Sequence, residues 1–420
     1  MNYTETLSWI HSYKANGRRP KQERMLAILE KLNHPQRKFS AVHVVGTNGK
    51  GSTVSFLQHI LTAAGYKTGS FTSPFIQSFN ERIAIDRQPI SDRELCRTAQ
   101  LVRPIIEDKQ LLSAWGRPTE FELVTLLMFT YFAYINPVDL AVIEAGVGGS
   151  HDATNVFTAL AVICPSISLD HQDRLGTSLS HIAQHKVGVL AENVPLIFAQ
   201  LQQEVRQIFY QKAALLKAPT YELGKDFSFA EHSDGSFCFY REPFTLSNIH
   251  LQLLGKHQKS NASLAVMAAL LLSRKLSGIT SAAIKTGLQR AVWPGRTEFI
   301  GSHLMLDGAH NEEAIQKLAD LLDDMFADKE IHILFAGLQR KPIKQLLSLL
   351  CHYDVRVTSF DFPDAQKLED YPPSYKKVQN WRLWLEKIPK QTDSLYVVTG
   401  SLYFISEVRN YLLSEETGKV

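Results

Sequence analysis

The sequence contains few cysteines and no closely spaced pair of them. Cys96, Cys164, Cys238 and Cys351 lie far apart along the chain, and none belongs to a CxxC motif. This spacing excludes the disulfide framework of a small secreted protein and a thiolate zinc site of the common kind. We therefore expect a reducing, cytoplasmic location.

The chain also lacks a large excess of charge of one sign, and it lacks long apolar runs. The chain has 45 Lys and Arg against 42 Asp and Glu, so a nucleic-acid partner is not expected. The longest apolar run, Leu264–Leu272, is too short to span a membrane. The N-terminal segment lacks an apolar signal region. Neither secretion nor membrane insertion is predicted, and internal repeats and low-complexity tracts are absent.

Apolar residues are nevertheless abundant enough to build a large core. Of 420 residues, 45% are hydrophobic and 21% are charged, a profile typical of a soluble globular protein. A length of this kind favours two or three domains. The segment Trp293–Arg296 places a rigid Pro beside a flexible Gly. We predict two domains, residues 1–297 and 298–420.

Short apolar runs alternate with helical patterns in the first predicted domain. The strand-like runs are Ala41–Gly46, Asp139–Gly146, Leu160–Ile167 and Pro195–Ala199. The helical patterns include Thr53–Ala64, Phe121–Tyr134 and Leu179–Leu190. Such alternation is typical of a doubly wound, mostly parallel sheet in an α/β domain.

The pattern changes toward the C-terminus. Residues 226–254 form short alternating runs around an Asp-Gly turn signal, which predicts a small antiparallel elaboration at the edge of the first domain. A helix follows at Asn261–Leu272. Beyond the boundary, strand-like runs at 331–337, 355–360 and 395–400 alternate with helical patterns at 312–327 and 342–352. These runs predict a smaller, Rossmann-like α/β domain.

A glycine-rich segment lies between the first strand-like run and the helical pattern that follows it. Glycines there let backbone N–H groups turn toward a phosphate, and a lysine adds positive charge. The predicted ATP-binding residues of this loop are Thr47, Asn48, Gly49, Lys50, Gly51, Ser52 and Thr53. Ser52 or Thr53 could hold Mg²⁺. Gly51 departs from the strict Walker pattern, and an ordinary glycine turn is the alternative interpretation.

Four further side chains are suited to metal or phosphate chemistry, and each has a simpler interpretation. Glu144 ends an apolar strand, where a carboxylate can bind Mg²⁺ or merely cap the next element. A lone histidine such as His171 is more often structural. Ser73 precedes a proline, which is a common turn signal. Lys186 by itself indicates a solvated lysine on a helix.

The ordered motifs resemble the folylpolyglutamate and dihydrofolate synthase branch of the Mur ligase superfamily. GTNGKGST is the family's form of the phosphate loop, and DLAVIEAGVGGSHDATN is similar to its EVGLGGRLDATN segment. The resemblance implies that Glu144 and Ser73 bind Mg²⁺ and that His171 serves a second Mg²⁺. It also implies that Lys186 is carbamylated by CO2, and it covers roughly residues 40–410.

The remaining motifs imply contacts with ATP and with the substrate. HQKSN, WPGR and DGAHN are similar to family signatures. The resemblance implies ATP contacts by Asn261, Arg296, Asp307 and His310. It implies substrate contacts by Phe75, Asp152 and Ala153.

Several positions depart from the family pattern. Ser150 stands where arginine is usual, Phe75 where histidine is usual, and His185 where glutamate is usual. The segment Gln339–Pro342 replaces a Lys-Asp-rich turn. The first two departures lie near the expected substrate, so they bear on which acceptor is used.

The resemblance implies an ATP- and Mg²⁺-dependent ligase that adds L-glutamate to the γ-carboxylate of folates, and dihydropteroate is a further possible acceptor. Lys50, Lys186, His171 and Arg296 are the expected catalytic residues. The alternatives are a related ligase with another carboxylate acceptor and a non-catalytic nucleotide-binding regulator. We expect small-molecule substrates and a monomer.

Overall fold

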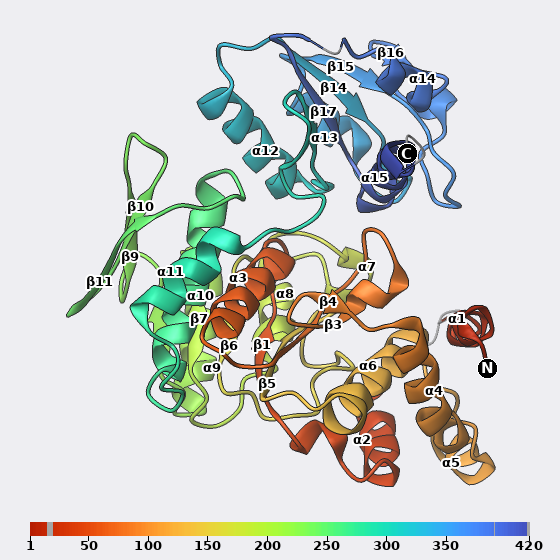
Figure 1. The fold of residues 1–420 in the computed structure, drawn as a ribbon, viewed down its shortest axis with the longest axis vertical. Coiled ribbons are helices and arrows are strands. Elements are labelled where there is room, and N and C mark those ends of the chain that lie inside the picture. Colours follow the sequence, from red (N-terminus) through yellow and green to blue (C-terminus); the bar gives the residue numbers. More distant parts are fainter. Residues whose placement is uncertain (15–19, 390, 418–420) are drawn as a thin grey trace. The chain divides into compact units, whose positions relative to one another are not determined.

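The computed structural model describes residues 1–14, 20–389 and 391–417. The chain forms two compact units (Figure 1). The first contains residues 1–75, 79–252 and 258–292, and the second contains residues 76–78, 253–257 and 293–420. The predicted domain limits, 1–297 and 298–420, stay a prediction, because compact units do not test where an independently folding domain ends.

An eight-stranded sheet forms the centre of the first unit, with the strand order β4-β3-β2-β5-β1-β6-β7-β8. The strands are β1 (Ser40–Val44), β2 (Thr68–Phe71), β3 (Ile83–Ile85), β4 (Gln88–Pro89), β5 (Leu140–Glu144), β6 (Val162–Cys164), β7 (Leu196–Phe198) and β8 (Thr220–Glu222). All pairings are parallel except those of β3 with β2 and with β4.

Helices cover both faces of this sheet (Figure 1). The helices of the first unit are α1 (Tyr3–His11), α2 (Gln22–Lys31), α3 (Lys50–Ala63), α4 (Asp92–Ile106), α5 (Lys109–Trp115), α6 (Glu120–Thr130), α7 (Gln172–Leu175), α8 (Leu179–Val187), α9 (Gln203–Leu215), α10 (Lys256–Leu272) and α11 (Ser281–Arg290). Short helical turns lie at Pro35–Arg37, Phe79–Arg82 and Tyr131–Ile135.

Strand alternation explains the two layers of packing. Ala41 of β1 belongs to a core cluster with α1, α2, α4 and α6, and Val45 belongs to a cluster with α8 and α9. Successive strand side chains point to opposite faces, so Val42 and Val44 face the side where α3 packs on β1 and β5. Gly287 of α11 brings that helix against α3, because a Cβ there would lie 2.4 Å from the Ile60 Cα.

The predicted antiparallel elaboration is a separate sheet of the first unit. Its strands, β9 (Ser228–Glu231), β10 (Phe237–Arg241) and β11 (Phe244–Ile249), pair antiparallel in the order β11-β10-β9. The sheet stands beside α10 and α11 (Figure 1). Its strands do not pair with the eight-stranded sheet, so it is more independent than the edge elaboration that the sequence suggested.

The second unit has a six-stranded sheet with the order β12-β13-β17-β14-β15-β16. Its strands are β12 (Glu298–Ile300), β13 (Leu304–Leu306), β14 (Ile331–Phe335), β15 (Asp354–Val357), β16 (Lys376–Lys377) and β17 (Leu395–Thr399). Only β12 pairs antiparallel. Its helices are α12 (Glu312–Met325), α13 (Ile343–Ser348), α14 (Trp381–Glu386) and α15 (Leu402–Thr417), with a turn at Leu368–Asp370.

These sheets confirm the predicted α/β class with mostly parallel strands. Apolar residues of both faces pack against the helices, as in the cluster of α12 and α13 in the second unit. Within the described part of the chain, no helix combines the length and the apolar character that crossing a bilayer requires.

Candidate active site

The glycine-rich loop connects β1 to α3 at the carboxyl edge of the eight-stranded sheet. Gly46 and Gly49 have φ angles of +146° and +80°, which favour glycine. Gly49 is the N-cap of α3, and Lys50 begins the helix. The first N–H groups of an α-helix lack carbonyl partners within it. At this position they lie at the end of a sheet, where α/β proteins bind ligands.

The N-terminus of α3 is not closed by its own side chains. No side chain accepts a hydrogen bond at its N-cap, and its first turn contains no acidic residue. By contrast, α1, α4 and α6 each begin with a reciprocal capping box that includes a glutamate. The α3 N-terminus therefore keeps the positive potential and the donors that an anion requires.

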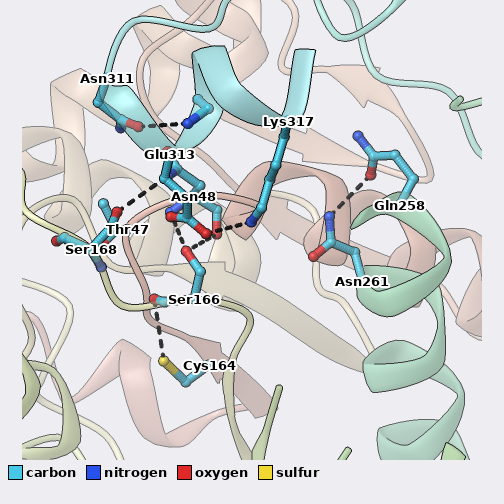
Figure 2. A network of polar contacts seen from close by, with 11 residues as sticks. Thr47, Asn48, Cys164, Ser166, Ser168, Gln258, Asn261, Asn311, Glu313 and Lys317 are labelled. Atoms are coloured by element: carbon cyan, nitrogen blue, oxygen red, sulfur yellow. Dashed lines mark hydrogen bonds and ion pairs between the residues drawn. The ribbon is translucent and has the colours of Figure 1, made fainter. Parts of the chain in front are cut away.

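Two serines after β6 hold the loop in place (Figure 2). The Asn48 N–H donates to Ser166 Oγ at 2.8 Å, and the Thr47 N–H donates to the Ser166 carbonyl at 2.9 Å. Thr47 Oγ1 also donates to the Ser168 carbonyl at 3.1 Å. Sequence reasoning missed Ser166 and Ser168, because serines near a strand end carry no distinctive spacing. The loop is thus positioned before any ligand arrives.

Asn261 lies against the same loop. A Cβ on Gly49 would lie 2.7 Å from Asn261 Oδ1, so α10 meets the loop at this glycine. The Asn261 Nδ2 donates to Gln258 Oε1 at 3.1 Å, as Figure 2 shows. The structure therefore places the predicted ATP contact Asn261 beside the glycine-rich loop, and its role stays a prediction.

Glu144 and Ser73 approach Lys50 from two neighbouring strands. Glu144 ends β5 and is buried, with Oε1 3.7 Å from Lys50 Nζ. The Ser73 N–H, just after β2, donates to Glu144 Oε2 at 3.4 Å. Lys50 Nζ also donates to the Thr47 carbonyl at 3.0 Å. A buried carboxylate, a serine and a lysine thus meet at the end of β1, β2 and β5.

Lys186 of α8 reaches the loop from the other side of β1. Its Nζ donates to the Gly46 carbonyl at 2.6 Å, and the side chain is buried. Burial lowers the pKa of Lys186 to about 7, and the nearby positive charge of Lys50 acts in the same direction. A substantial share of neutral amine is therefore present near neutral pH. This contradicts the simple reading of Lys186 as a solvated surface lysine.

His171 differs from the other predicted metal ligands in being exposed. It lies after β6 as the N-cap of α7, is exposed and has a φ of +50°. Across residues 1–14, 20–389 and 391–417, no three His, Cys, Asp or Glu side chains gather as a metal-binding group. Mg²⁺ commonly uses only one or two carboxylates together with phosphate oxygens and water. Glu144 with neighbouring hydroxyls fits that mode better than a cage made by the protein.

Asp152 bonds within its own loop. Its carboxylate accepts the Val147 N–H at 2.9 Å and both the N–H and the hydroxyl of Thr154 at 3.0 and 2.6 Å. The Thr154 hydroxyl also contacts His43 Nε2 at 2.8 Å. Burial raises the pKa of Asp152, and these hydrogen bonds oppose that rise. Asp152 therefore stabilises the loop, while substrate contact by Asp152 and the buried Ala153 stays a prediction.

Two of the departures from the family pattern contact each other. Ser150 Oγ lies 3.2 Å from His185 Nδ1, and the Ser150 N–H donates to the His185 carbonyl at 2.7 Å. Burial lowers the pKa of His185, and the charges of His151 and His181 lower it further. The family resemblance implies arginine and glutamate at these two positions, so a serine and a histidine stand beside Lys186 in place of an oppositely charged pair.

Phe75 contacts other aromatic and cationic side chains rather than offering a polar group. Its ring lies 6.2 Å from that of Phe79, and the Arg82 guanidinium lies 5.3 Å from the Phe75 centroid. This position can contribute apolar area and a cation–π contact. The predicted role of Phe75 in binding substrate stays a prediction.

Arg296, Asp307 and His310 belong to the second unit. The Asp307 carboxylate accepts the N–H groups of Thr297 and Ala309, both at 2.9 Å. Burial raises the pKa of Asp307, and the charge of Arg296 opposes this. His310 Nδ1 lies 2.8 Å from the Gly308 carbonyl. Asp307 and His310 lie in an ordered turn after β13, Arg296 lies just before β12, and the nucleotide contacts of all three stay predictions.

Comparisons with known proteins extend over nearly the whole chain. No family model matches the sequence. The chain is 37% identical to the dihydrofolate synthase/folylpolyglutamate synthase of Bacillus subtilis, over 98% of this chain and 99% of that protein. It is 33% identical to the folylpolyglutamate synthase of Lacticaseibacillus casei, over 98% and 99%. A solved FPGS–AMPPCP–folate complex matches with a TM-score of 0.87 at 32% identity, covering 98% of this chain and 100% of that chain.

Proposed function

Because the chain belongs to the folylpolyglutamate synthase and dihydrofolate synthase family, we propose that it is an ATP-dependent ligase that joins L-glutamate to the γ-carboxylate of a folate. A solved family complex contains the ATP analogue AMPPCP together with folate. These two ligands match the substrates of the proposed reaction. The Bacillus subtilis relative is also named a dihydrofolate synthase, so dihydropteroate is a second acceptor to test.

The proposed reaction has two balanced steps. A folate carboxylate oxygen attacks the γ-phosphorus of ATP, forming an acyl phosphate as the bond to ADP breaks. The neutral amino group of glutamate then attacks the acyl carbon. An amide bond forms, phosphate leaves, and the nitrogen loses a proton. The protein contributes chiefly position and charge, as is usual for phosphoryl transfer.

The uncapped N-terminus of α3 is the single observation that carries this proposal. Its first N–H groups and the Lys50 ammonium offer donors and positive charge to a polyphosphate. Ser166 holds the loop in this conformation by accepting the Asn48 N–H. Because the donors are already aimed, binding requires little rearrangement, and Lys50 can offset charge on the transferring phosphoryl group.

The residues around Lys50 fit magnesium that arrives with ATP. When bound, Mg²⁺ offsets the negative charge of phosphate oxygens. Glu144, Ser73 and Ser52 would hold one ion, and His171 would serve a second. Glu144 supplies the charge, and its burial keeps its orientation fixed.

Lys186 fits carbamylation. Its neutral amine can attack the carbon of CO2, forming an N–C bond and releasing a proton. The product is an anion in place of a cation beside Lys50. The lowered pKa of the neighbouring His185 favours its neutral form, so this side chain adds no negative charge that would repel the carbamate.

The remaining predicted contacts complete the proposal. Arg296, Asp307 and His310 would contact the nucleotide, and Phe75, Asp152 and Ala153 would line the acceptor. These six assignments rest on the family resemblance.

The experiment measures ATP hydrolysis by the purified protein with and without folate and glutamate. We expect ADP release only when both are present with Mg²⁺, and products that grow by glutamyl units in mass spectra. Parallel reactions with dihydropteroate and tetrahydrofolate identify the acceptor. Binding of ATP with no ADP release under any of these conditions would favour a regulatory nucleotide-binding protein and overturn the proposal.

A different carboxylate acceptor is the other alternative. This alternative predicts glutamate-dependent ADP release with a different carboxylate compound and no ADP release with dihydropteroate or tetrahydrofolate. The neutral Ser150–His185 pair and the apolar Phe75 are the observations that make this arm worth running.

A further inference from the structure

The turn that precedes β12 has a backbone conformation that its residues do not all favour. Gly295 and Thr297, on either side of Arg296, have φ angles of +66° and +44°. Glycine adopts a positive φ at little cost, but a β-branched residue such as Thr297 does so only under strain. Thr297 is also buried. Such strain persists only where surrounding contacts hold the backbone, and it is concentrated at functional sites.

Two carboxylates hold this turn from either side of Arg296. Glu298 Oε2 accepts the Gly295 N–H at 2.7 Å, and Asp307 Oδ2 accepts the Thr297 N–H at 2.9 Å. Glu298 is the first residue of β12, which pairs with β13, and Asp307 directly follows β13. The backbone on both sides of Arg296 is therefore anchored to the sheet of the second unit.

The Arg296 side chain is confined as well. A Cβ added to Gly308 would lie 2.5 Å from Arg296 Nη1, so the guanidinium lies against this glycine. The Gly308 N–H donates to the Gly295 carbonyl at 2.8 Å. The turn and residue 308 thus meet through the backbone and through the Arg296 side chain. A shift of the turn would therefore move the guanidinium.

Arg409 of α15 holds Glu298 in the orientation that reaches the turn. Its Nε lies 2.9 and 3.0 Å from the two Glu298 carboxylate oxygens, and its Nη1 donates to Gln77 Oε1 at 2.9 Å. The side chains of Arg409 and Glu298 are only 14% and 20% exposed. Partly buried, charge-assisted bonds of this kind are stronger than those of exposed ion pairs. The two charges cancel, so the pair adds no net charge beside Arg296.

We propose that Glu298 and Arg409 are positioning residues that set the Arg296 guanidinium for its contact with the nucleotide. This inference rests on the nucleotide contact proposed above for Arg296. Glu298 acts through the Gly295 N–H, and Arg409 acts through Glu298. Because the guanidinium is held before the nucleotide binds, less conformational entropy is lost on binding.

A double-mutant cycle tests this chain of contacts. Titration calorimetry with AMPPCP and Mg²⁺ measures nucleotide binding without turnover. Glu298→Ala should weaken binding about tenfold, roughly the contribution of one charged hydrogen bond. In an Arg296→Ala background the same substitution should change the affinity by less than about twofold, because the residue through which it acts is gone. A purely structural role would give the same loss in both backgrounds.

Further variants separate positioning from folding. Glu298→Gln keeps an oxygen that can accept the Gly295 N–H, so it should recover most of the affinity that Glu298→Ala loses. Arg382→Ala breaks another ion pair of α15, with Glu407, and should leave the affinity unchanged. Thermal unfolding shows which variants fold. If Glu298→Ala does not fold, Arg409→Met replaces it in the cycle with the same expected coupling.

The inference is overturned if Glu298→Ala binds AMPPCP as tightly as the unmodified protein, or if its loss of affinity is the same with and without the Arg296 side chain. The ligase assay tests the proposed function separately. A protein that binds AMPPCP but releases no ADP with folate and glutamate contradicts the proposed function and leaves this cycle measurable. Absence of AMPPCP binding would overturn both.

Discussion

The N-termini of α3 and α6 show how the same local structure serves two purposes. Thr119 and Glu122 close α6 with a capping box, and the Glu122 carboxylate also pairs with buried Arg24 at 2.7 Å. The α3 N-terminus has a glycine cap and no acid. The α6 terminus uses N–H donors in hydrogen bonds within the fold, and we propose that the α3 terminus offers its N–H donors to a ligand. Changes at α6 should therefore affect stability, and changes at α3 should affect ATP.

The largest expected effect is at the closed terminus. Glu122→Ala leaves the buried Arg24 guanidinium without its carboxylate, which should destabilise the fold by about 3–5 kcal/mol. Thermal and denaturant unfolding measure this loss. The exposed capping-box variant Glu5→Ala is the control and should cost about 1 kcal/mol. If Glu122→Ala kept native stability but weakened ATP binding, the assignment of the α6 terminus to stability alone would be wrong.

Next comes the charge at the open terminus. Lys50→Met should lower kcat/KM about 100- to 1,000-fold, because positive charge at the transferring phosphoryl group is lost. Steady-state kinetics and ATP titration calorimetry measure the effect. Lys275→Met removes an exposed lysine after α10 and should change neither quantity. Activity within a few-fold of the unmodified protein would show that α3 is not a phosphate site.

Lys186 predicts a pH effect of intermediate size. With a pKa of about 7, the amine is mostly protonated below pH 7 and mostly neutral above it, so carbamate should decrease as the pH falls through 7. Between pH 8 and pH 6 the neutral fraction falls about tenfold.

Carbon-13 NMR with labelled bicarbonate reports this carbamate directly, apart from activity. The signal should disappear in Lys186→Ala. A signal that is absent from the unmodified protein at pH 8 would contradict the assignment, whatever the activity.

The smallest expected effect comes from replacing the glycine at either end of α3. The two substitutions separate backbone strain at a positive φ from a steric contact of the new Cβ. Gly49→Ala places a Cβ 2.7 Å from Asn261 Oδ1 at a φ of +80°. Gly65→Ala has similar strain, with a φ of +87°, but no atom within 4 Å of the added Cβ. Both should lose about 1 kcal/mol of stability.

Only Gly49→Ala should raise the KM for ATP, by about fivefold. Kinetics at saturating folate and glutamate give that value for both variants. Equal KM values would mean that the loop and Asn261 do not act together on the nucleotide.

Much of the fold was predictable because its signals are local. The apolar run at 41–46, the glycine loop and the helix after it appear as β1, the loop and α3 with ends shifted by a few residues. The N-terminal helices α1, α2 and α4 were not predicted. The capping boxes of α1 and α4, at Asn2 and Ser91, are nevertheless clear sequence signals.

The sequence by itself determined where the glycine-rich loop lies between a strand and a helix, because glycine, lysine and strand-to-helix order are local properties of the chain. Tertiary structure decided which groups surround it. Only folding buries Lys186 against the Gly46 carbonyl and so shifts its pKa, and only folding brings Asn261 to Gly49. Burial and long-range proximity depend on every packed element at once, so no single segment can encode them.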